Sequence, residues 1–337
     1  MRIDQVDLRD EATFEDYYRV VVECAEDLWP GQPTWQPHEI LATIHGWDGT
    51  YECKHLMARD VDGSVLGSAE ICFGQLENLD AGEGNLEVLP GRRRRGVGTA
   101  LLLEMERMVM AEGRRELSMR EEFPMSLEHV SAGSPFAARH GYMLAQTMER
   151  RDLTLPFDES EIARLEAEAA QHSAGYRVVR WDNECAEELL AGRAELMRGM
   201  STDAPQGDLL RDEEEWDVDR IRSADGTVAR MNRTKLGVGA VHEESGALVA
   251  MSELSIPNTA PTQVYQHDTI VLGAHRGKRL GLLVKTALLR DLVRVNPVTE
   301  RVCTWNAEDN APMIGINEQL GWRLAGKVRS YKKDLRS

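Results

Sequence analysis

Apolar residues recur along this chain with two spacings, and each spacing predicts one kind of element. Residues 98–112 place five apolar side chains on one helical face, which predicts an amphipathic helix. These side chains are Leu101, Leu102, Met105, Met108 and Val109. Residues 54–60 and 65–73 are apolar-rich runs on either side of Asp62-Gly63, so they predict two strands joined by a turn.

The other runs extend this pattern through both halves of the chain. The first half adds predicted helices at 14–28, 37–45 and 135–140 and strands at 85–89, 115–120 and 147–155. The second half adds strands at 176–180, 234–242, 248–256, 266–272, 302–305 and 327–335, and helices at 186–197, 280–295 and 310–320. This order predicts, in each half, a mixed sheet with helices on both faces.

The two halves repeat one another at a fixed offset. Arg93-Arg94-Arg95-Gly96-Val97-Gly98 opens a helix after a strand, and Arg276-Gly277-Lys278-Arg279-Leu280-Gly281 does the same 183 positions later. The same offset aligns Glu70 with Glu253 and Val88 with Val271. A constant offset over about thirty-five residues indicates two copies of one fold. We therefore predict an N-terminal domain at 1–156, a connecting helix at 157–175 and a C-terminal domain at 176–337.

Composition indicates a soluble globular protein. The chain has 337 residues, of which 42% are hydrophobic and 6% aromatic, enough for about two domains. No run approaches the roughly 20 apolar residues of a membrane span, and the N-terminus has no apolar signal core. We therefore expect a cytoplasmic protein with no membrane partner.

The net charge of −17 opposes binding to a nucleic-acid backbone. The basic run at 92–95 is the segment that would favour such binding, but no aromatic residues are interleaved with it. We expect no nucleic-acid partner. An acidic surface would steer a cationic small molecule toward the protein, or would simply keep it soluble.

Cysteine and histidine spacing predicts neither a disulfide nor a metal site. The five cysteines are scattered and form no C-x-x-C pair, so we expect reduced, buried thiols. They are Cys24, Cys53, Cys72, Cys185 and Cys303. The nine histidines show neither H-x-x-x-H nor HExxH spacing.

The repeated turn rich in glycine and arginine is a candidate anion site. The first backbone N–H groups of a helix lack internal partners, and the helix dipole favours negative charge there. Glycine lets the backbone approach a phosphate closely. A Rossmann dinucleotide site would need G-x-G-x-x-G after the first strand and an acidic residue about 20 positions on. Here the loop follows the third or fourth strand of each half, so that site is disfavoured.

The strand "LEVLPG", the loop "RRRRGVG" and the helix "TALLLEME" together resemble the acetyl-CoA signature Q/R-x-x-G-x-G/A of the GNAT acyltransferase superfamily. Arg93, Gly96 and Gly98 fill its three fixed positions. The segments "TIVLGAHRGKRLGLLVK" and "TWNAEDNAPMIGINEQLGW" resemble it again, with Asn310 at the position of the family's helix asparagine. The resemblance implies an α/β (α+β) protein of two tandem GNAT domains, similar to tandem proteins of actinobacteria. Each domain would be a mixed, mostly antiparallel sheet with helices on both faces.

The resemblance also implies where acetyl-CoA, or another acyl-CoA, binds. The strand before each loop would splay from the next strand and leave a gap for pantetheine. A backbone N–H there would hold the thioester oxygen as it becomes an oxyanion, and the loop amides would hold the pyrophosphate. The cofactor-binding residues expected in the first half are Val88, Leu89, Arg93, Arg94, Arg95, Gly96, Val97, Gly98 and Thr99. Those expected in the second half are Val271, Leu272, Arg276, Gly277, Lys278, Arg279, Leu280, Gly281 and Asn310.

The two halves depart from the family pattern differently. Arg279 stands where the pattern has glycine, whereas the first half has the intact loop but Val130 at the position of Asn310. We therefore expect tighter acetyl-CoA binding in the N-terminal half. Ala137 and Asn317 replace the tyrosine that protonates the leaving thiolate in many members, so neither half has the usual acid.

Carboxylates near the expected sulfur are the candidate general bases, because a base must reach the ammonium nucleophile directly or through one water. Glu87 lies on the strand before the first loop, and Asp268, next to His267, lies on the equivalent strand of the second half. Glu70 and Glu253 share a register on the preceding strand and would act through water. For each carboxylate the alternative is a solvent-facing position on a strand, and His267 is more readily a hydrogen-bond partner than a base.

These features predict an acyltransferase that moves an acetyl group from acetyl-CoA to an amine by direct attack, with one domain catalytic and the other degenerate. The expected acceptor is a small amine of secondary metabolism, with a peptide N-terminus as an alternative. A non-catalytic acyl-CoA-binding sensor or carrier is the alternative from another class, and the missing tyrosines favour it.

Overall fold

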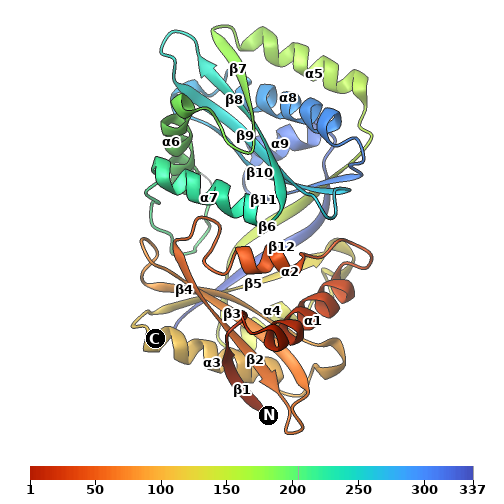
Figure 1. The fold of residues 1–337 in the computed structure, drawn as a ribbon, viewed down its shortest axis with the longest axis vertical. Helices are drawn as coiled ribbons and strands as arrows, with labels where there is room; N and C mark the ends of the chain where they lie inside the picture. Colours follow the sequence, from red (N-terminus) through yellow and green to blue (C-terminus); the bar gives the residue numbers. More distant parts are fainter. Residues whose placement is uncertain (204, 337) are drawn as a thin grey trace. The chain divides into compact units, whose positions relative to one another are not determined.

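The computed structural model describes residues 1–203 and 205–336, which form two compact units (Figure 1). The first unit comprises residues 1–147 and 206–212 and the C-terminal stretch from Gly326. The second comprises residues 148–205 and 213–325. Each unit has one mixed sheet with helices on both faces, which confirms the predicted fold class. Every helix in the described part of the chain is too short or too polar to span a bilayer.

The sheet of the first unit has the order β1-β2-β3-β4-β5-β12. Its strands are β1 (Arg2–Val6), β2 (Tyr51–Arg59), β3 (Val65–Gly74), β4 (Ala81–Val88), β5 (Glu116–Pro124) and the part of β12 (Arg323–Asp334) from Gly326 onward. Its helices are α1 (Glu11–Leu28), α2 (Pro37–Ala42), α3 (Val97–Ala111) and α4 (Gly133–Arg139). β1 to β4 are antiparallel neighbours, β4 and β5 pair in parallel, and β12 is antiparallel to β5.

The helices α1 and α3 cover opposite faces of this sheet. Successive side chains of a strand point to opposite faces, so Leu56 and Met57 of β2 enter different cores. Leu56 packs with the five apolar residues that predicted the α3 helix, and all five are buried. Met57 packs with Tyr17 and Val20 of α1. A ligand held between β4 and β5 would therefore meet α3 on one side and α1 on the other.

The sheet of the second unit has the order β6-β11-β10-β9-β8-β7. Its strands are the part of β6 (Met143–Thr154) from Met148 onward, β7 (Tyr176–Asp182), β8 (Arg233–His242), β9 (Leu248–Pro257), β10 (Gln263–Val271) and β11 (Arg301–Ala307). Its helices are α5 (Glu159–His172), α6 (Glu187–Asp203), α7 (Val218–Arg230), α8 (Leu280–Val295) and α9 (Ala311–Gln319). β10 and β11 pair in parallel, as β4 and β5 do in the first unit.

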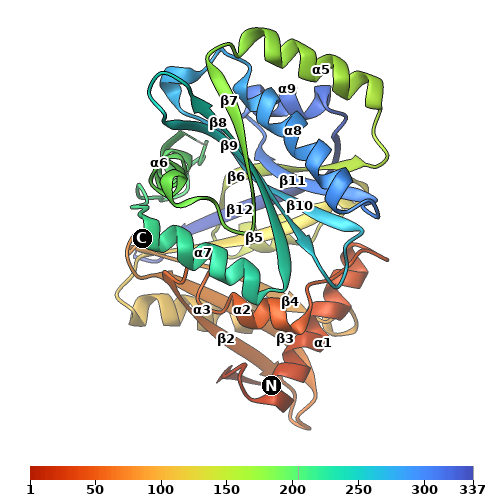
Figure 2. The same cartoon turned by 45° about the horizontal axis from the view of Figure 1, so that its top comes forward.

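Figure 2 shows α5 and α8 on one face of the second sheet and α6 and α7 on the other. Ile162 and Leu165 of α5 are buried in one core with Leu288 of α8. Leu190 of α6 and Ile221 of α7 belong to the core on the opposite face. The helix predicted to connect two domains is thus part of the second unit's core.

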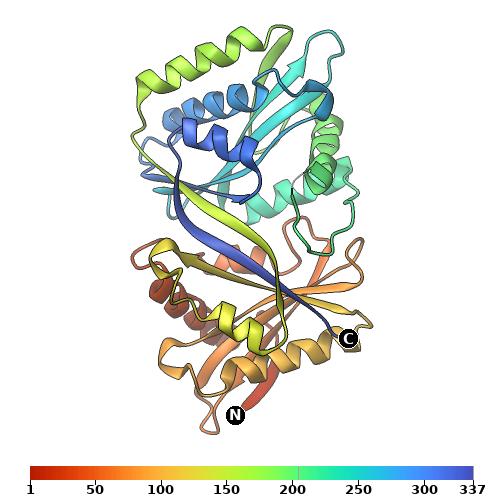
Figure 3. The ribbon, with the colours of Figure 1, turned by 180° about the vertical axis from the view of Figure 1, so that it is seen from behind.

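Each unit also includes a strand from the other half of the sequence. Residues 326–334 of β12 pair with β5 in the first unit, and residues 148–154 of β6 pair with β11 in the second. Figure 3 shows both strands from behind, β12 in blue and β6 in yellow-green. The compact units therefore differ from the predicted division at 1–156, 157–175 and 176–337, because strand pairing decides which core a strand joins.

One disulfide departs from the predicted cysteine chemistry. Cys53 of β2 and Cys72 of β3 face one another in register, with their Cα atoms 4.0 Å apart, and their sulfurs are bonded. Neighbouring strands bring opposite side chains together. The two cysteines are 19 residues apart in the sequence, so their spacing gave no sign of this pairing. The expectation of five reduced thiols was wrong for this pair. Cys24, Cys185 and Cys303 are free and buried, as predicted.

Candidate functional site

The repeated loops adopt the same backbone conformation in both units. Arg94 and Gly96 have left-handed φ values of 64° and 84°, and Gly277 and Arg279 have values of 78° and 56° at the equivalent positions. Each loop thus places one glycine and one arginine in the left-handed region, in exchanged order. That region strains residues other than glycine. Because Arg279 takes the turn that Gly96 takes, its side chain does not alter the path of the second loop.

The first arginine of each motif closes the loop onto the preceding strand. Nε of Arg93 donates to the carbonyl oxygen of Val88 at 3.1 Å, and Nε of Arg276 donates to that of Val271 at 3.2 Å. Nη1 of Arg93 also pairs with Asp27 at 2.7 Å. These two guanidinium groups therefore shape the loop, and the backbone amides are left to face an anion.

The remaining residues of the loops leave both helix N-termini open. No side chain among the described residues caps α3 or α8. The exposed positions are Arg94, Arg95, Gly96, Gly277, Lys278 and Arg279, while Val97 and Leu280 are buried anchors. Nη2 of Arg279 pairs with Glu168 of α5 at 2.7 Å. Oγ1 of Thr99 lies 3.1 Å from Nε2 of His140. Uncapped N–H groups beside exposed cations form a surface suited to a pyrophosphate.

The last glycine of each motif lies against the next helix of its unit. A Cβ atom on Gly98 would sit 3.5 Å from the ring of Phe136 in α4, and one on Gly281 would sit 3.2 Å from Ile316 in α9. In α9, Oδ1 of Asn310 accepts from the backbone N–H of Met313 at 3.3 Å and so caps that helix. The structure thus gives Asn310 a capping contact at the position expected to contact the cofactor.

The strand before each loop splays from its parallel neighbour, as the resemblance implies. β4 pairs with β5 only at residues 81–84, and β10 pairs with β11 only at residues 263–265. The N–H of Leu89 donates to Leu66 and that of Leu272 to Val249, so both are already engaged. Antiparallel strands alternate bonded and non-bonded pairs, which turns the N–H groups of Val88 and Val271 toward the gap. Of the two expected oxyanion donors in each unit, the geometry favours Val88 and Val271.

In the first unit, two carboxylates lie on the α1 face of the sheet beside this gap. Glu70 and Glu87 are half-buried, and Oε2 of Glu70 lies 3.1 Å from Nε2 of His55. The ring of Tyr17 meets His55 edge-on, with centroids 5.4 Å apart. Glu87 makes no hydrogen bond or ion pair with any described residue. Burial and the charge of Glu70 raise the pKa of Glu87 to about 7, against the opposing charge of Arg93.

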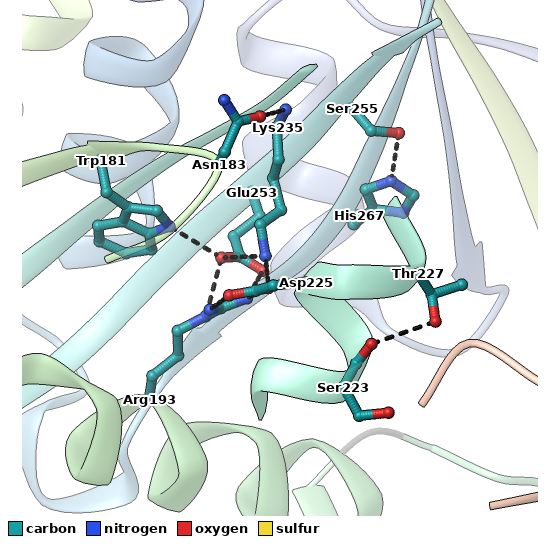
Figure 4. Close-up of polar contacts among 10 residues, drawn as sticks. All are labelled: Trp181, Asn183, Arg193, Ser223, Asp225, Thr227, Lys235, Glu253, Ser255 and His267. Carbon is teal, nitrogen blue, oxygen red and sulfur yellow. Dashed lines mark hydrogen bonds and ion pairs between the residues drawn. The ribbon is translucent and has the colours of Figure 1, made fainter. Parts of the chain in front are cut away.

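The second unit holds the equivalent of Glu70 in a closed network of charges (Figure 4). Glu253 accepts from Nη2 of Arg193 at 3.2 Å and from Nε1 of Trp181 at 3.1 Å. Asp225 accepts two hydrogen bonds from Arg193, at 2.6 and 2.8 Å, and pairs with Lys235. All five side chains are buried. Burial alone would raise the pKa of Glu253, but the charges of Lys235 and Arg193 lower it to about 2.

This network argues against Glu253 as a base. A carboxylate with so low a pKa has little tendency to take up a proton near neutral pH. The 183-residue offset that aligns Glu70 with Glu253 also aligns Glu87 with Ile270. Gly237 lies opposite Glu253 in the second sheet, as His55 lies opposite Glu70 in the first. The second unit therefore has an apolar side chain where the first has its unpartnered carboxylate.

Asp268 and His267 lie where the pairing of β10 with β9 is irregular. Nε2 of His267 lies 2.7 Å from Oγ of Ser255, and burial together with the charge of Arg233 lowers the pKa of His267 to about 4. Burial and the charge of Glu253 raise the pKa of Asp268 to about 6. His267 is thus a neutral hydrogen-bond partner at neutral pH, and Asp268 is the remaining candidate base of the second unit.

Sequence reasoning did not find His55, Tyr17 or the partners of Glu253. The hairpin turn at Asp62-Gly63 does contain a signal for His55, since counting outward from it pairs His55 with Glu70. Tyr17 and Arg193 come from helices that cross the sheet, and no local pattern gives their position.

Comparison with known proteins agrees with this geometry. Residues 15–122 match the model of the acetyltransferase (GNAT) family. No curated protein matches the chain. A tandem GNAT protein from the clavulanic acid biosynthesis pathway is similar in structure, with a TM-score of 0.79 and 21% identity, covering 99% of this chain and 98% of its own.

Two further structures are similar over nearly the whole chain. A GCN5-related N-acetyltransferase from Sphaerobacter thermophilus has a TM-score of 0.68 and 14% identity, covering 100% of this chain and 96% of its own. The glucosamine N-acetyltransferase region of a fungal multi-domain β-N-acetylglucosaminidase has a TM-score of 0.64 and 12% identity, covering 98% of this chain and 38% of its own. At these identities the likeness concerns the fold. This chain has the tandem GNAT fold, and its N-terminal unit contains the segment that matches the family model.

Proposed function

We propose that this protein is an acyl-CoA-dependent N-acyltransferase and that transfer takes place in the first unit. Backbone amides from Gly96 to Thr99 bind the pyrophosphate, and the N–H of Val88 binds the thioester oxygen. The amine approaches from the α1 face, on which Glu87 lies. Its nitrogen attacks the thioester carbon, Glu87 accepts the proton that the nitrogen loses, and the carbon–sulfur bond breaks to release CoA.

The observation that supports this proposal is the state of Glu87. It is half-buried and unpartnered within the described residues, and it adjoins the N–H that faces the gap. A general base works best when its pKa lies near the working pH, and that of Glu87 is about 7. Burying a carboxylate without a partner costs stability, so its presence is more readily explained by chemistry than by packing.

The second unit supports the same assignment by contrast. Its loop keeps the geometry of an anion site, but Ile270 replaces Glu87 and the network of Arg193 and Lys235 holds Glu253. We therefore propose that it binds acyl-CoA without transferring the acyl group. The preference for the first unit now depends on Glu87 rather than on Arg279, whose backbone follows that of Gly96.

The test is CoA-thiol release from acetyl-CoA with a panel of small amines, comparing Glu87→Gln with Asp268→Asn. We expect Glu87→Gln to lower kcat by about 100-fold or more, because that is the usual contribution of a general base. Asp268→Asn is the matched control in the second unit and should leave kcat unchanged. Loss of activity in Asp268→Asn alone would move transfer to the second unit and overturn the assignment.

Binding is tested separately by native mass spectrometry with acetyl-CoA. Gly96→Trp and Gly281→Trp each place a bulky side chain at the anion site of one unit. If a variant no longer shows the added mass of a bound acetyl-CoA, that molecule binds in the substituted unit. We expect Gly96→Trp to remove the acetyl-CoA that supports turnover. Turnover that persists in Gly96→Trp and disappears in Gly281→Trp would contradict the proposal.

One observation favours a second candidate, a non-catalytic acyl-CoA sensor or carrier. Ala137 and Asn317 occupy the position of the usual tyrosine acid, and Nδ2 of Asn317 donates to Asn306 at 2.7 Å. A thiol with a pKa near 8.5 can leave as thiolate without that acid, although less readily. Stable retention of acetyl-CoA with no turnover on any amine would support this candidate.

A further inference from the structure

A pocket of about 250 Å³ opens in the first unit where α1 ends and where β5 ends. It is lined by Asp27, Leu28, Trp29, Pro30 and Gln32 from α1 and the turn after it, and by Pro124, Ser126 and Leu127 from the segment after β5. β5 is the strand from which β4 splays, so the pocket adjoins the gap assigned to the thioester.

Contacts along α1 relate this pocket to Glu87. Sγ of Cys24 lies 3.6 Å from the carbonyl oxygen of Val88, the residue after Glu87. Leu28 follows Cys24 by one helical turn, a rise of about 6 Å. Asp27 reaches the same carbonyl through Arg93, which pairs with Asp27 and donates to Val88. The pocket therefore begins about one helical turn from the contact between Cys24 and Val88, the residue after Glu87.

The walls of the pocket are mostly apolar. Leu28, Pro30, Pro124 and Leu127 contribute aliphatic surface, and Trp29 contributes an aromatic ring. Trp29 packs against the backbone of Gly326 in β12, since a Cβ atom there would lie 2.8 Å from the indole. A strand from the C-terminal end of the chain thus supports one wall. Walls of this kind bind a ring or another compact apolar group.

The charges next to the pocket are unfavourable for an anion. Glu70 and Glu87 present two carboxylates on the α1 face, while Asp27 at the pocket is paired with Arg93. Two nearby cationic side chains already have partners, since Arg93 is bound to Asp27 and Val88, and His55 contacts Glu70. An ammonium group would be attracted by Glu70 and Glu87, whereas a carboxylate on the adjacent carbon would meet like charge.

We propose that the acceptor of the first unit is a small primary amine whose body is an uncharged ring and whose amine-bearing carbon has no carboxylate. This inference rests on the proposed function and narrows its substrate class. The amine lies at Glu87 and the ring lies in the pocket, which begins one helical turn along α1 from Cys24. Free amino acids are disfavoured by charge, because their carboxylate would lie beside Glu70 and Glu87.

The test compares phenethylamine with phenylalanine, which has the same skeleton and one additional carboxylate. With acetyl-CoA as donor, kcat/KM should be about 100-fold or more higher for phenethylamine, because like charges in a partly buried site repel strongly. Trp29→Ala should raise the KM for phenethylamine by about 10-fold and leave the KM for acetyl-CoA unchanged. Trp35→Ala, which removes a ring outside the pocket, is the control and should change neither.

A second variant keeps the test informative if Trp29→Ala unfolds. Leu127→Trp should fill the pocket, so that phenethylamine is lost as a substrate while ethylamine is still acetylated. Equal rates with phenylalanine, preference for a short peptide, or no effect of Leu127→Trp would overturn the inference and leave the proposed function standing. Failure to acetylate any amine, ethylamine included, while acetyl-CoA still binds would instead contradict the proposed function.

Discussion

Glu70 and Glu253 occupy the same position of the sequence repeat, and their neighbours give them different chemistry. Glu70 has one partner, His55, and lies beside a second carboxylate, Glu87. Glu253 is surrounded by Arg193, Lys235 and Trp181. Nearby positive charge favours the ionised form of a carboxyl, while burial and nearby negative charge disfavour it. The side chain alone therefore does not decide which carboxylate can accept a proton.

The raised pKa of Glu87 predicts that Glu87→Gln stabilises the first unit at alkaline pH. The folded protein binds the Glu87 proton up to about pH 7, whereas the unfolded chain releases it near the ordinary value of 4.5. Stability is therefore lost as pH rises through this window, and the whole cost is present above pH 7. Glutamine removes that cost, so the free energy of unfolding should rise by about 1–3 kcal/mol at pH 8 and by little at pH 5.

Urea denaturation at both pH values measures this change. Tyr17, Cys24, Glu70 and Arg93 face Glu87 from the neighbouring elements and remain in the variant. A difference in unfolding free energy between variant and wild type that is the same at both pH values, or a loss of stability at pH 8, would show that Glu87 is not held at a cost. Gain of stability with loss of activity is the pattern expected of a functional residue.

The sequence predicted the position of Glu87 but not its state. Its place next to Val88 follows from the motif, because the loop fixes which strand residues reach the gap. Its pKa depends on Glu70 from a neighbouring strand and on burial under α1, and neither is visible in local spacing. The same limit applies to Arg193, which approaches Glu253 from a helix sixty residues away in the chain.

At the scale of elements, the loop accepts arginine at a left-handed position where the family pattern has glycine. Arg279 stands where the family pattern has glycine, yet Gly96 and Arg279 both adopt the left-handed conformation. Arg94 does the same in the first loop. The helices after the loops were predicted well, since their apolar spacing matches the faces they bury. β1 and α7 were not predicted. α7 contains a glycine and three arginines, and it is held by tertiary contacts such as Asp225 with Arg193.

The contacts between α6, α7 and the second sheet predict a large effect of Arg193→Met. This change leaves Asp225 and Glu253 buried with Lys235 as their remaining cation, so it should lower the free energy of unfolding by about 3–5 kcal/mol. Arg222→Met is the matched control, because Arg222 of α7 pairs with Glu187 at 2.8 Å on the surface and should cost about 1 kcal/mol or less.

Hydrogen exchange of β8 and β9 amides in both variants measures this difference within the second unit. Exchange should accelerate in Arg193→Met and stay near the wild-type rate in Arg222→Met. Acyl transfer by the first unit should persist in both variants under conditions in which that unit remains folded. Equal protection in the two variants would show that the network does not support the second unit.

At the scale of the molecule, the repeat in the sequence and the units in space have different boundaries. The repeat predicted two tandem copies, and the fold confirms them. The sequence could not show that β12 completes the first sheet and β6 the second, because both strands have similar apolar patterns and follow equivalent helices. Which of two similar strands joins a given edge depends on the folded neighbours of that edge rather than on the strand itself.

Because β12 comes from the other half of the chain, we predict that residues 1–156 expressed alone do not form the native first unit. The fragment lacks residues 326–334, which pair along the whole of β5, and residues 206–212, in which Arg211 pairs with Glu83. An unpaired β5 edge exposes backbone donors and acceptors, so the fragment should aggregate or show weak exchange protection in β5. Co-expression with residues 157–337 supplies β12 and should restore that protection. A soluble 1–156 fragment with wild-type protection in β5 would instead mean that β6 replaces β12 at this edge. The first unit would then not need a strand from the other half of the chain.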